Sequence, residues 1–224
     1  ITMLNSVSVG AGDVPLIIVH GLFGSARNWR SLQKRLAQNR WVIAVDLRNH
    51  GESFWDDDNS YHALAADIAD VIDANGGVAE VLGHSMGGKA AMVLALTHHE
   101  KLRHLIVADM APTAYQRTQV QHIEAMKSVD LSAVARRTDA DKQLAERLDI
   151  AALRAFFVQS LEITESGARW QLNLDALGAE MPKIMGFPAV SGVFEKRTLM
   201  LTGAESDYVL PEMEPETLKL FPQA

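Results

Sequence analysis

The sequence predicts an α/β fold: a mostly parallel sheet with flanking helices and a helical cap insertion. Five short, continuous apolar runs are typical of parallel strands that are buried on both faces. Helix-like segments separate the first four runs, which implies right-handed crossovers and helices on both faces of the sheet. A long helix-rich stretch then precedes the fifth run. The expected strands are residues 15–20, 41–46, 79–84, 104–109 and 197–203.

Each expected helix of the sheet region has its own signal. Residues 26–38 carry apolar residues at nearly helical spacing, among them Trp29 and Leu36. Residues 60–77 end in Gly-Gly, a common helix stop. Residues 86–99 are rich in Ala, Leu and Met, which predicts a largely buried helix.

The chain is expected to divide into a core and a cap. Residues 1–110 and 193–224 supply the sheet and its helices. Residues 111–192 hold helical stretches and no convincing strand, so we expect them to form a cap, or lid, over the carboxyl ends of the strands. The expected cap helices lie within 115–128, 141–160 and 171–180.

The composition is that of an ordinary globular protein, with 48% hydrophobic and 22% charged residues. A net charge of −7 argues against a nucleic-acid partner, which needs a basic surface. Cysteine is absent, which excludes disulfides and a thiolate metal site. The N-terminus lacks a signal-peptide pattern and no apolar run approaches about 18 residues, so we expect a cytoplasmic protein without a membrane span. We expect no metal or cofactor, and leave open whether the protein is a monomer or a dimer.

Residues 83–87, Gly-His-Ser-Met-Gly, match the nucleophile elbow G-x-S-x-G between an expected strand and an expected helix. Ser85 is therefore the candidate nucleophile. A tight turn lifts its Oγ above the sheet, and side chains at Gly83 and Gly87 would collide with neighbouring elements. Met86 N–H opens the helix, where the helix dipole favours an oxyanion.

The second oxyanion donor should come from the loop after the first expected strand, His-Gly-Leu-Phe-Gly-Ser at 20–25. Leu22 N–H is the preferred donor and Phe23 N–H the alternative. The side chains of Leu22 and Phe23 would line an apolar acyl pocket. Phe23 and His84 are the candidate substrate-binding residues.

Two aspartates compete for the role of catalytic acid. Asp109 ends the strand that follows the serine's helix, and a crossover of that size places this strand beside the serine strand, roughly 5 Å away. Asp207 follows the next strand, which is the more usual position. We prefer Asp109 and keep Asp207 as the alternative acid, although either could simply cap a helix.

The general base cannot be assigned among the eight histidines. In enzymes with this elbow, the histidine follows both the serine and the acid in the chain. The last histidine is His122, which lies in the expected cap and is not expected to reach the site. His20, His50 and His84 belong to turns, where we expect them to make local hydrogen bonds.

Together these motifs resemble the α/β-hydrolase superfamily, specifically its YbfF-type bacterial esterase branch. The matching stretches are VHGLFGSARNW, VDLRNHGES, GHSMGGKAAM, ADMAPTAY, TGAESDYV and the terminal LFPQA. The resemblance implies a serine ester hydrolase with Ser85 as nucleophile, Leu22 and Met86 as oxyanion donors and the acid at Asp109. It also implies a further strand, a histidine loop and a helix of roughly 30–40 residues. We therefore expect that this sequence is incomplete, without its C-terminal strand and helix, and that the catalytic histidine lies beyond residue 224.

The expected function is hydrolysis of carboxylic esters or acyl thioesters of short acyl chains through an acyl-enzyme on Ser85. One alternative is another serine-dependent chemistry, as in C–C bond hydrolases and perhydrolases. The other is a catalytically silent binding protein, since a serine without its base is a poor nucleophile. Lys89, one turn into the serine's helix, is expected to anchor a loop or lie on the helix surface rather than take part in chemistry.

Overall fold

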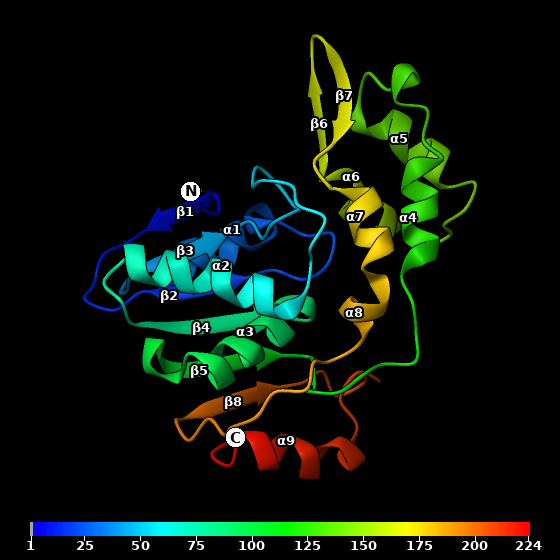
Figure 1. Cartoon of the computed structure of the whole chain (residues 1–224). Helices are drawn as coiled ribbons and strands as arrows, with labels where there is room; N and C mark the ends of the chain where they lie inside the picture. Colours follow the sequence, from blue (N-terminus) through cyan, green and yellow to red (C-terminus); the bar gives the residue numbers. More distant parts are fainter. Residues whose placement is uncertain (1) are drawn as a thin grey trace.

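A six-stranded sheet forms the centre of the computed structural model, which describes residues 2–224 (Figure 1). The strands lie in the order β1-β3-β2-β4-β5-β8, and all neighbours are parallel except β1 and β3. This confirms the predicted mostly parallel α/β sheet. The strands are β1 (Ser6–Val9), β2 (Leu16–Val19), β3 (Val42–Val45), β4 (Ala79–His84), β5 (Leu102–Ala108) and β8 (Thr198–Leu201).

The buried strands are the ones that the sequence reveals. All residues of β2 and β3 are buried, because helices cover both faces of the sheet at these strands. The sequence prediction misses β1, which reads Ser-Val-Ser-Val and is largely exposed. It lies at the edge of the sheet, beside β3 alone, and so it needs no continuous apolar run.

The helices of the sheet region lie close to the predicted ranges. The hydroxyl of Ser60 accepts a hydrogen bond from Ala63 N–H and caps the longest of them, α2. Every residue from Met86 to Leu96 in α3 is buried, since this helix packs against β4, β5 and α2. The elements are η1 (Ala26–Trp29), α1 (Arg30–Leu36), α2 (Tyr61–Ala74), α3 (Met86–Thr97), η2 (His99–Lys101), η4 (Pro211–Met213) and α9 (Glu214–Leu220).

The elements between β5 and β8 stand together beyond the carboxyl ends of the parallel strands (Figure 1). They are α4 (Val120–Lys127), η3 (Leu131–Ala133), α5 (Arg137–Leu144), α6 (Ala151–Val158), β6 (Leu161–Thr164), β7 (Gly167–Trp170), α7 (Leu174–Ala179) and α8 (Met181–Met185). The division into a core and a 111–192 cap stays a prediction.

The expectation that residues 111–192 contain no strand is wrong. β6 and β7 pair as an antiparallel hairpin. Each strand has four residues, too few for a clear alternating pattern, and Gly167 takes a φ of 129° at the turn. The expected helix over 141–160 is also split in two, as α5 and α6. None of the helices described here is long and apolar enough to cross a membrane.

Candidate active site

Ser85 lies in a sharp turn between β4 and α3. Its φ of 54° and ψ of −120° are angles that favour glycine and are uncommon for serine. Neighbouring backbone explains the two flanking glycines: a Cβ on Gly83 would lie 2.2 Å from the oxygen of Gly87, and one on Gly87 would lie 2.3 Å from the oxygen of His20. The main chain therefore passes too close to its neighbours for any larger residue at either position.

The main-chain N–H groups of Leu22 and Met86, which lie beside Ser85, have no hydrogen-bond acceptor among residues 2–224. Phe23 N–H, the alternative donor, is already engaged and donates to Nε2 of His50 at 3.1 Å. The geometry thus favours Leu22 over Phe23 as the second donor. Phe23 itself has a φ of 67°, so the loop that presents Leu22 N–H is also strained.

Two buried histidines hold this loop in place. Nδ1–H of His50 donates to the oxygen of Arg48 at 2.9 Å, which leaves Nε2 to accept from Phe23 N–H. His20 is bonded in the same way: Nδ1–H donates to Gly21 O, and Nε2 accepts from Leu47 N–H at 2.9 Å. Burial lowers the pKa of His50 to about 3 and also lowers the pKa of His20, so both rings are neutral at pH 7.

Asp109 follows β5 at the position next to Ser85. In the parallel pairing His84 lies opposite Ala108, and both Ser85 and Asp109 come one residue later on adjacent strands. Asp109 N–H donates to the oxygen of Leu201 at 2.7 Å, and φ is 56°. Its Oδ1 is buried and has no hydrogen-bond partner in the described part of the chain.

Asp207 has a different environment. Its side chain is 75% exposed and forms an ion pair with Arg117, whose Nη2 lies 3.3 Å from Oδ2. The structure therefore brings Asp109 to the neighbourhood of Ser85 and places Asp207 in a surface ion pair.

None of the histidines within 2–224 forms a hydrogen bond with the hydroxyl of Ser85. The expectation that His122 does not reach the site is wrong as to its place, since it lines the same cavity as Ser85. Its ring packs against Phe23 and Phe157, its Nδ1 is buried without a partner, and burial lowers its pKa.

His84 is not among the residues that line the cavity, and its assignment as a substrate-binding residue stays a prediction. Its ring packs edge-on against Trp29, with the centroids 5.8 Å apart. Burial lowers the pKa of His84, while the charge of Asp109 acts in the opposite direction. Phe23, the other candidate, does line the cavity.

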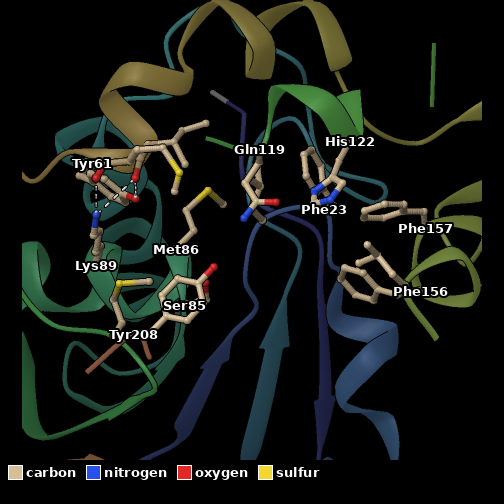
Figure 2. A pocket seen from close by; sticks show the side chains of 15 residues that line it. Phe23, Tyr61, Ser85, Met86, Lys89, Gln119, His122, Phe156, Phe157 and Tyr208 are labelled. Atoms are coloured by element: carbon tan, nitrogen blue, oxygen red, sulfur yellow. Dashed lines mark hydrogen bonds between the residues drawn. The ribbon is translucent and has the colours of Figure 1, made fainter. Parts of the chain in front are cut away.

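The cavity at Ser85 measures about 110 Å³ and is mostly apolar. Figure 2 shows Ser85 and Met86 between two groups of side chains. One group is aromatic, with Phe23, His122, Phe156 and Phe157, and the other contains Tyr61 and Lys89. Gln119, from the segment before α4, points between them.

The sequence does not identify most of the residues that line the cavity, because Tyr61, Gln119, Phe156 and Phe157 belong to no recognisable motif. Lys89 was placed on the correct helix but is buried, and burial lowers its pKa to about 7. Within 2–224, no group of three or more His, Cys, Asp or Glu side chains is arranged to hold a metal ion.

A parallel sheet with a strained serine between a strand and a helix, facing a second donor loop, defines the α/β-hydrolase class. The chain belongs to the α/β-hydrolase fold family, in its YbfF-type branch, and the family pattern matches residues 14–179.

The chain is similar to proteins named as a lipase or as esterases. The chain is 40% identical to mouse (Mus musculus) sn-1-specific diacylglycerol lipase ABHD11, over 96% of this chain and 73% of that protein. It is 32% identical to esterase YbfF of Escherichia coli K12, over 94% of this chain and 82% of that protein. A solved marine microorganism esterase superposes with a TM-score of 0.94 at 35% identity, covering 100% of this chain and 89% of that one.

Proposed function

We propose that this protein is a serine hydrolase that cleaves carboxylic esters or acyl thioesters of short acyl chains through an acyl-enzyme on Ser85. One observation carries the proposal. Ser85 has a positive φ, which is uncommon for residues other than glycine, and lies beside the N–H groups of Leu22 and Met86. Residues 2–224 supply no hydrogen-bond acceptor for these two N–H groups. The names of the relatives, esterase and lipase, support ester hydrolysis in general.

In the proposed reaction, the hydroxyl oxygen of Ser85 attacks the acyl carbon and its proton passes to a general base. The carbonyl oxygen becomes an oxyanion that accepts hydrogen bonds from Leu22 N–H and Met86 N–H, each worth about 2.7–4 kcal/mol of barrier. The base then protonates the departing alcohol or thiol, and water releases the acid from Ser85.

Asp109 is the proposed acid, because its buried Oδ1 has no partner within the described chain and can accept the N–H of an imidazole. Residues 2–224 bring no imidazole to the hydroxyl of Ser85, so the base is the part of the triad that they do not supply. We propose residues 111–192 as the cap, since Gln119, His122 and Phe157 from this segment line the cavity.

The size of the cavity supports short acyl groups. A cavity of about 150 Å³ in a protein core holds one benzene molecule. The space at Ser85 is smaller, about 110 Å³, and therefore fits an acyl chain of only a few carbons. Leu22 and Phe23 supply apolar contacts along it.

Covalent labelling of the full gene product with a fluorophosphonate tests the nucleophile. Wild type should be labelled and hydrolyse p-nitrophenyl esters, and Ser85→Ala should do neither. Equal labelling of both proteins would remove Ser85 from the mechanism.

A panel of p-nitrophenyl esters, acyl-CoAs and a vinylogous diketone then compares ester, thioester and C–C bond cleavage by kcat/KM. A folded wild type that shows neither labelling nor turnover would indicate the silent binding protein. The observation that favours this second candidate is that no histidine within 2–224 forms a hydrogen bond with the hydroxyl of Ser85.

A further inference from the structure

The side chain of Lys89 joins the serine's helix to the end of α8 by hydrogen bonds. It lies one turn after Ser85 in α3 and is only 1% exposed. Its Nζ donates to three consecutive carbonyl oxygens: to Gly186 at 2.6 Å, to Met185 at 3.1 Å and, at the longer distance of 3.5 Å, to Ile184. Figure 2 shows Lys89 reaching up beside Tyr61 toward this segment.

These carbonyls need donors from outside their own helix. The last carbonyls of a helix have no intrahelical N–H partner and carry partial negative charge. Lys89 meets that need together with two other groups. The hydroxyl of Tyr61, from α2, donates to Ile184 O at 2.6 Å, and Tyr115 N–H donates to Met185 O at 2.7 Å.

The contacts of the Lys89 side chain fit an anchoring role. A lysine ammonium has three N–H donors, and three carbonyls occupy them. When protonated, its Nζ lies against two aromatic faces, 4.8 Å from the ring centroid of Tyr115 and 5.7 Å from that of Tyr61. No acidic side chain of the described chain pairs with it.

The segment that Lys89 holds is part of the cavity wall. Ile184 and Met185 both line the cavity that contains Ser85. A shift of 184–186 away from α3 would therefore enlarge the cavity, whereas the elbow and the oxyanion donors would stay in place.

We propose that Lys89 is a positioning residue that fixes the 184–186 wall against the serine's helix and so sets the upper limit on the length of the acyl chain. The proposal rests on the proposed esterase function. It predicts an effect on substrate selection rather than on the chemical step.

Replacement of Lys89 by Met tests this proposal, because it keeps the unbranched apolar stem of the side chain, one atom shorter, and removes its donors. The matched control is Lys196→Met. Lys196 also donates to two carbonyls, of His99 and Leu102 at 2.8 and 2.7 Å, but does not line the cavity. A hydrogen bond to a charged group contributes about 1.5–3 kcal/mol, so its loss predicts a change of about tenfold or more.

We expect Lys89→Met to raise KM for p-nitrophenyl acetate and butyrate about tenfold. The ratio of kcat/KM for octanoate to that for butyrate should rise by a similar factor, and kcat for butyrate should stay within about threefold. Lys196→Met should lower stability without changing that ratio. Lys89→Arg, which keeps a cation and its donors, should restore part of the wild-type ratio.

Hydrogen exchange gives a readout that does not depend on turnover. Amides of residue 181 and of residues 183–186 should exchange faster in Lys89→Met and at the wild-type rate in Lys196→Met. If Lys89→Met does not fold, Lys89→Leu, which also lacks side-chain donors, replaces it in both measurements. If wild type hydrolyses no ester, the proposed function fails, and hydrogen exchange alone decides the anchoring role.

Two outcomes would overturn the proposal. One is unchanged exchange at 181–186 together with an unchanged acyl-length ratio. The other is a loss confined to kcat, which would assign Lys89 to the chemical step.

Discussion

The backbone strain at Ser85 leads to a prediction that a stability measurement can test. Its φ of 54° and ψ of −120° match the first central position of a type II′ turn, where glycine is the favoured residue. Glycine at this position should relieve the strain, whereas alanine should retain it. We therefore expect Ser85→Gly to be more stable than Ser85→Ala, although both remove the hydroxyl.

The magnitude follows from two opposing terms. A residue in such a region costs about 1–3 kcal/mol. Glycine loses about 0.5–1 kcal/mol to its greater freedom in the unfolded chain. The free energy of unfolding of Ser85→Gly should therefore exceed that of Ser85→Ala by about 1 kcal/mol, between limits of about 0 and 2.5 kcal/mol, or by about 2–4 °C in Tm for the middle value.

Urea unfolding of the two variants measures this difference, and Ser128 supplies the control pair. Ser128 has ordinary helical angles, a φ of −73° and a ψ of −13°, at the end of α4. There Ser128→Gly should be no more stable than Ser128→Ala. If Ser85→Ala equalled or exceeded Ser85→Gly in stability, or if both pairs changed in the same direction, the elbow would hold no strain that glycine relieves.

Two further predictions concern the acid and the response to pH. Asp109→Asn should lower kcat for ester hydrolysis by about 10³–10⁴. Asp207→Asn breaks only an exposed ion pair, so its kcat should stay within about twofold of the wild-type value. Steady-state kinetics measures kcat of both variants. A large loss of kcat in Asp207→Asn with little loss in Asp109→Asn would make Asp207 the acid. For pH, the unfolded chain binds a proton at His50 below about 6.5, whereas the folded protein does so only near 3. The free energy of unfolding should thus fall as pH drops through this window, by about 1.4 kcal/mol per pH unit for His50. Urea melts from pH 7.5 to 5 measure the slope, which His50→Asn should reduce; an unchanged slope would contradict the assignment of a neutral, buried His50.

The sequence predicts those parts of the fold in which burial is continuous along the chain. β2, β3 and β4 are found because helices cover both faces of the sheet and leave unbroken apolar runs. β1 and the β6–β7 hairpin are missed because each is short and partly exposed. Local patterns carry no information about strands that are stabilised mainly by pairing.

The candidate site divides in a similar way. The elbow is visible because close contacts, 2.2 Å at a Cβ on Gly83, demand glycine at fixed spacing from Ser85. His50 was read only as a histidine in a loop, because its bond to Phe23 N–H joins residues 27 positions apart. His122 was misplaced because the path of residues 111–192 over the strands decides which side chains reach the cavity, and no motif encodes that path.

The hydrogen bonds that follow the strand ends carry a consequence for control of the site. Ser85 N–H donates to Ala108 O at 3.1 Å, and Asp109 N–H donates to Leu201 O at 2.7 Å. Each proposed catalytic residue thus takes its position from the end of the next strand, and within residues 2–224 the last strand of this series is β8. No residue of β8 lines the cavity, yet Leu201 at the end of β8 accepts the hydrogen bond that positions the backbone of Asp109, the proposed acid. Substitutions in Thr198–Leu201 should therefore change turnover from outside the cavity, by displacing the acid relative to the nucleophile.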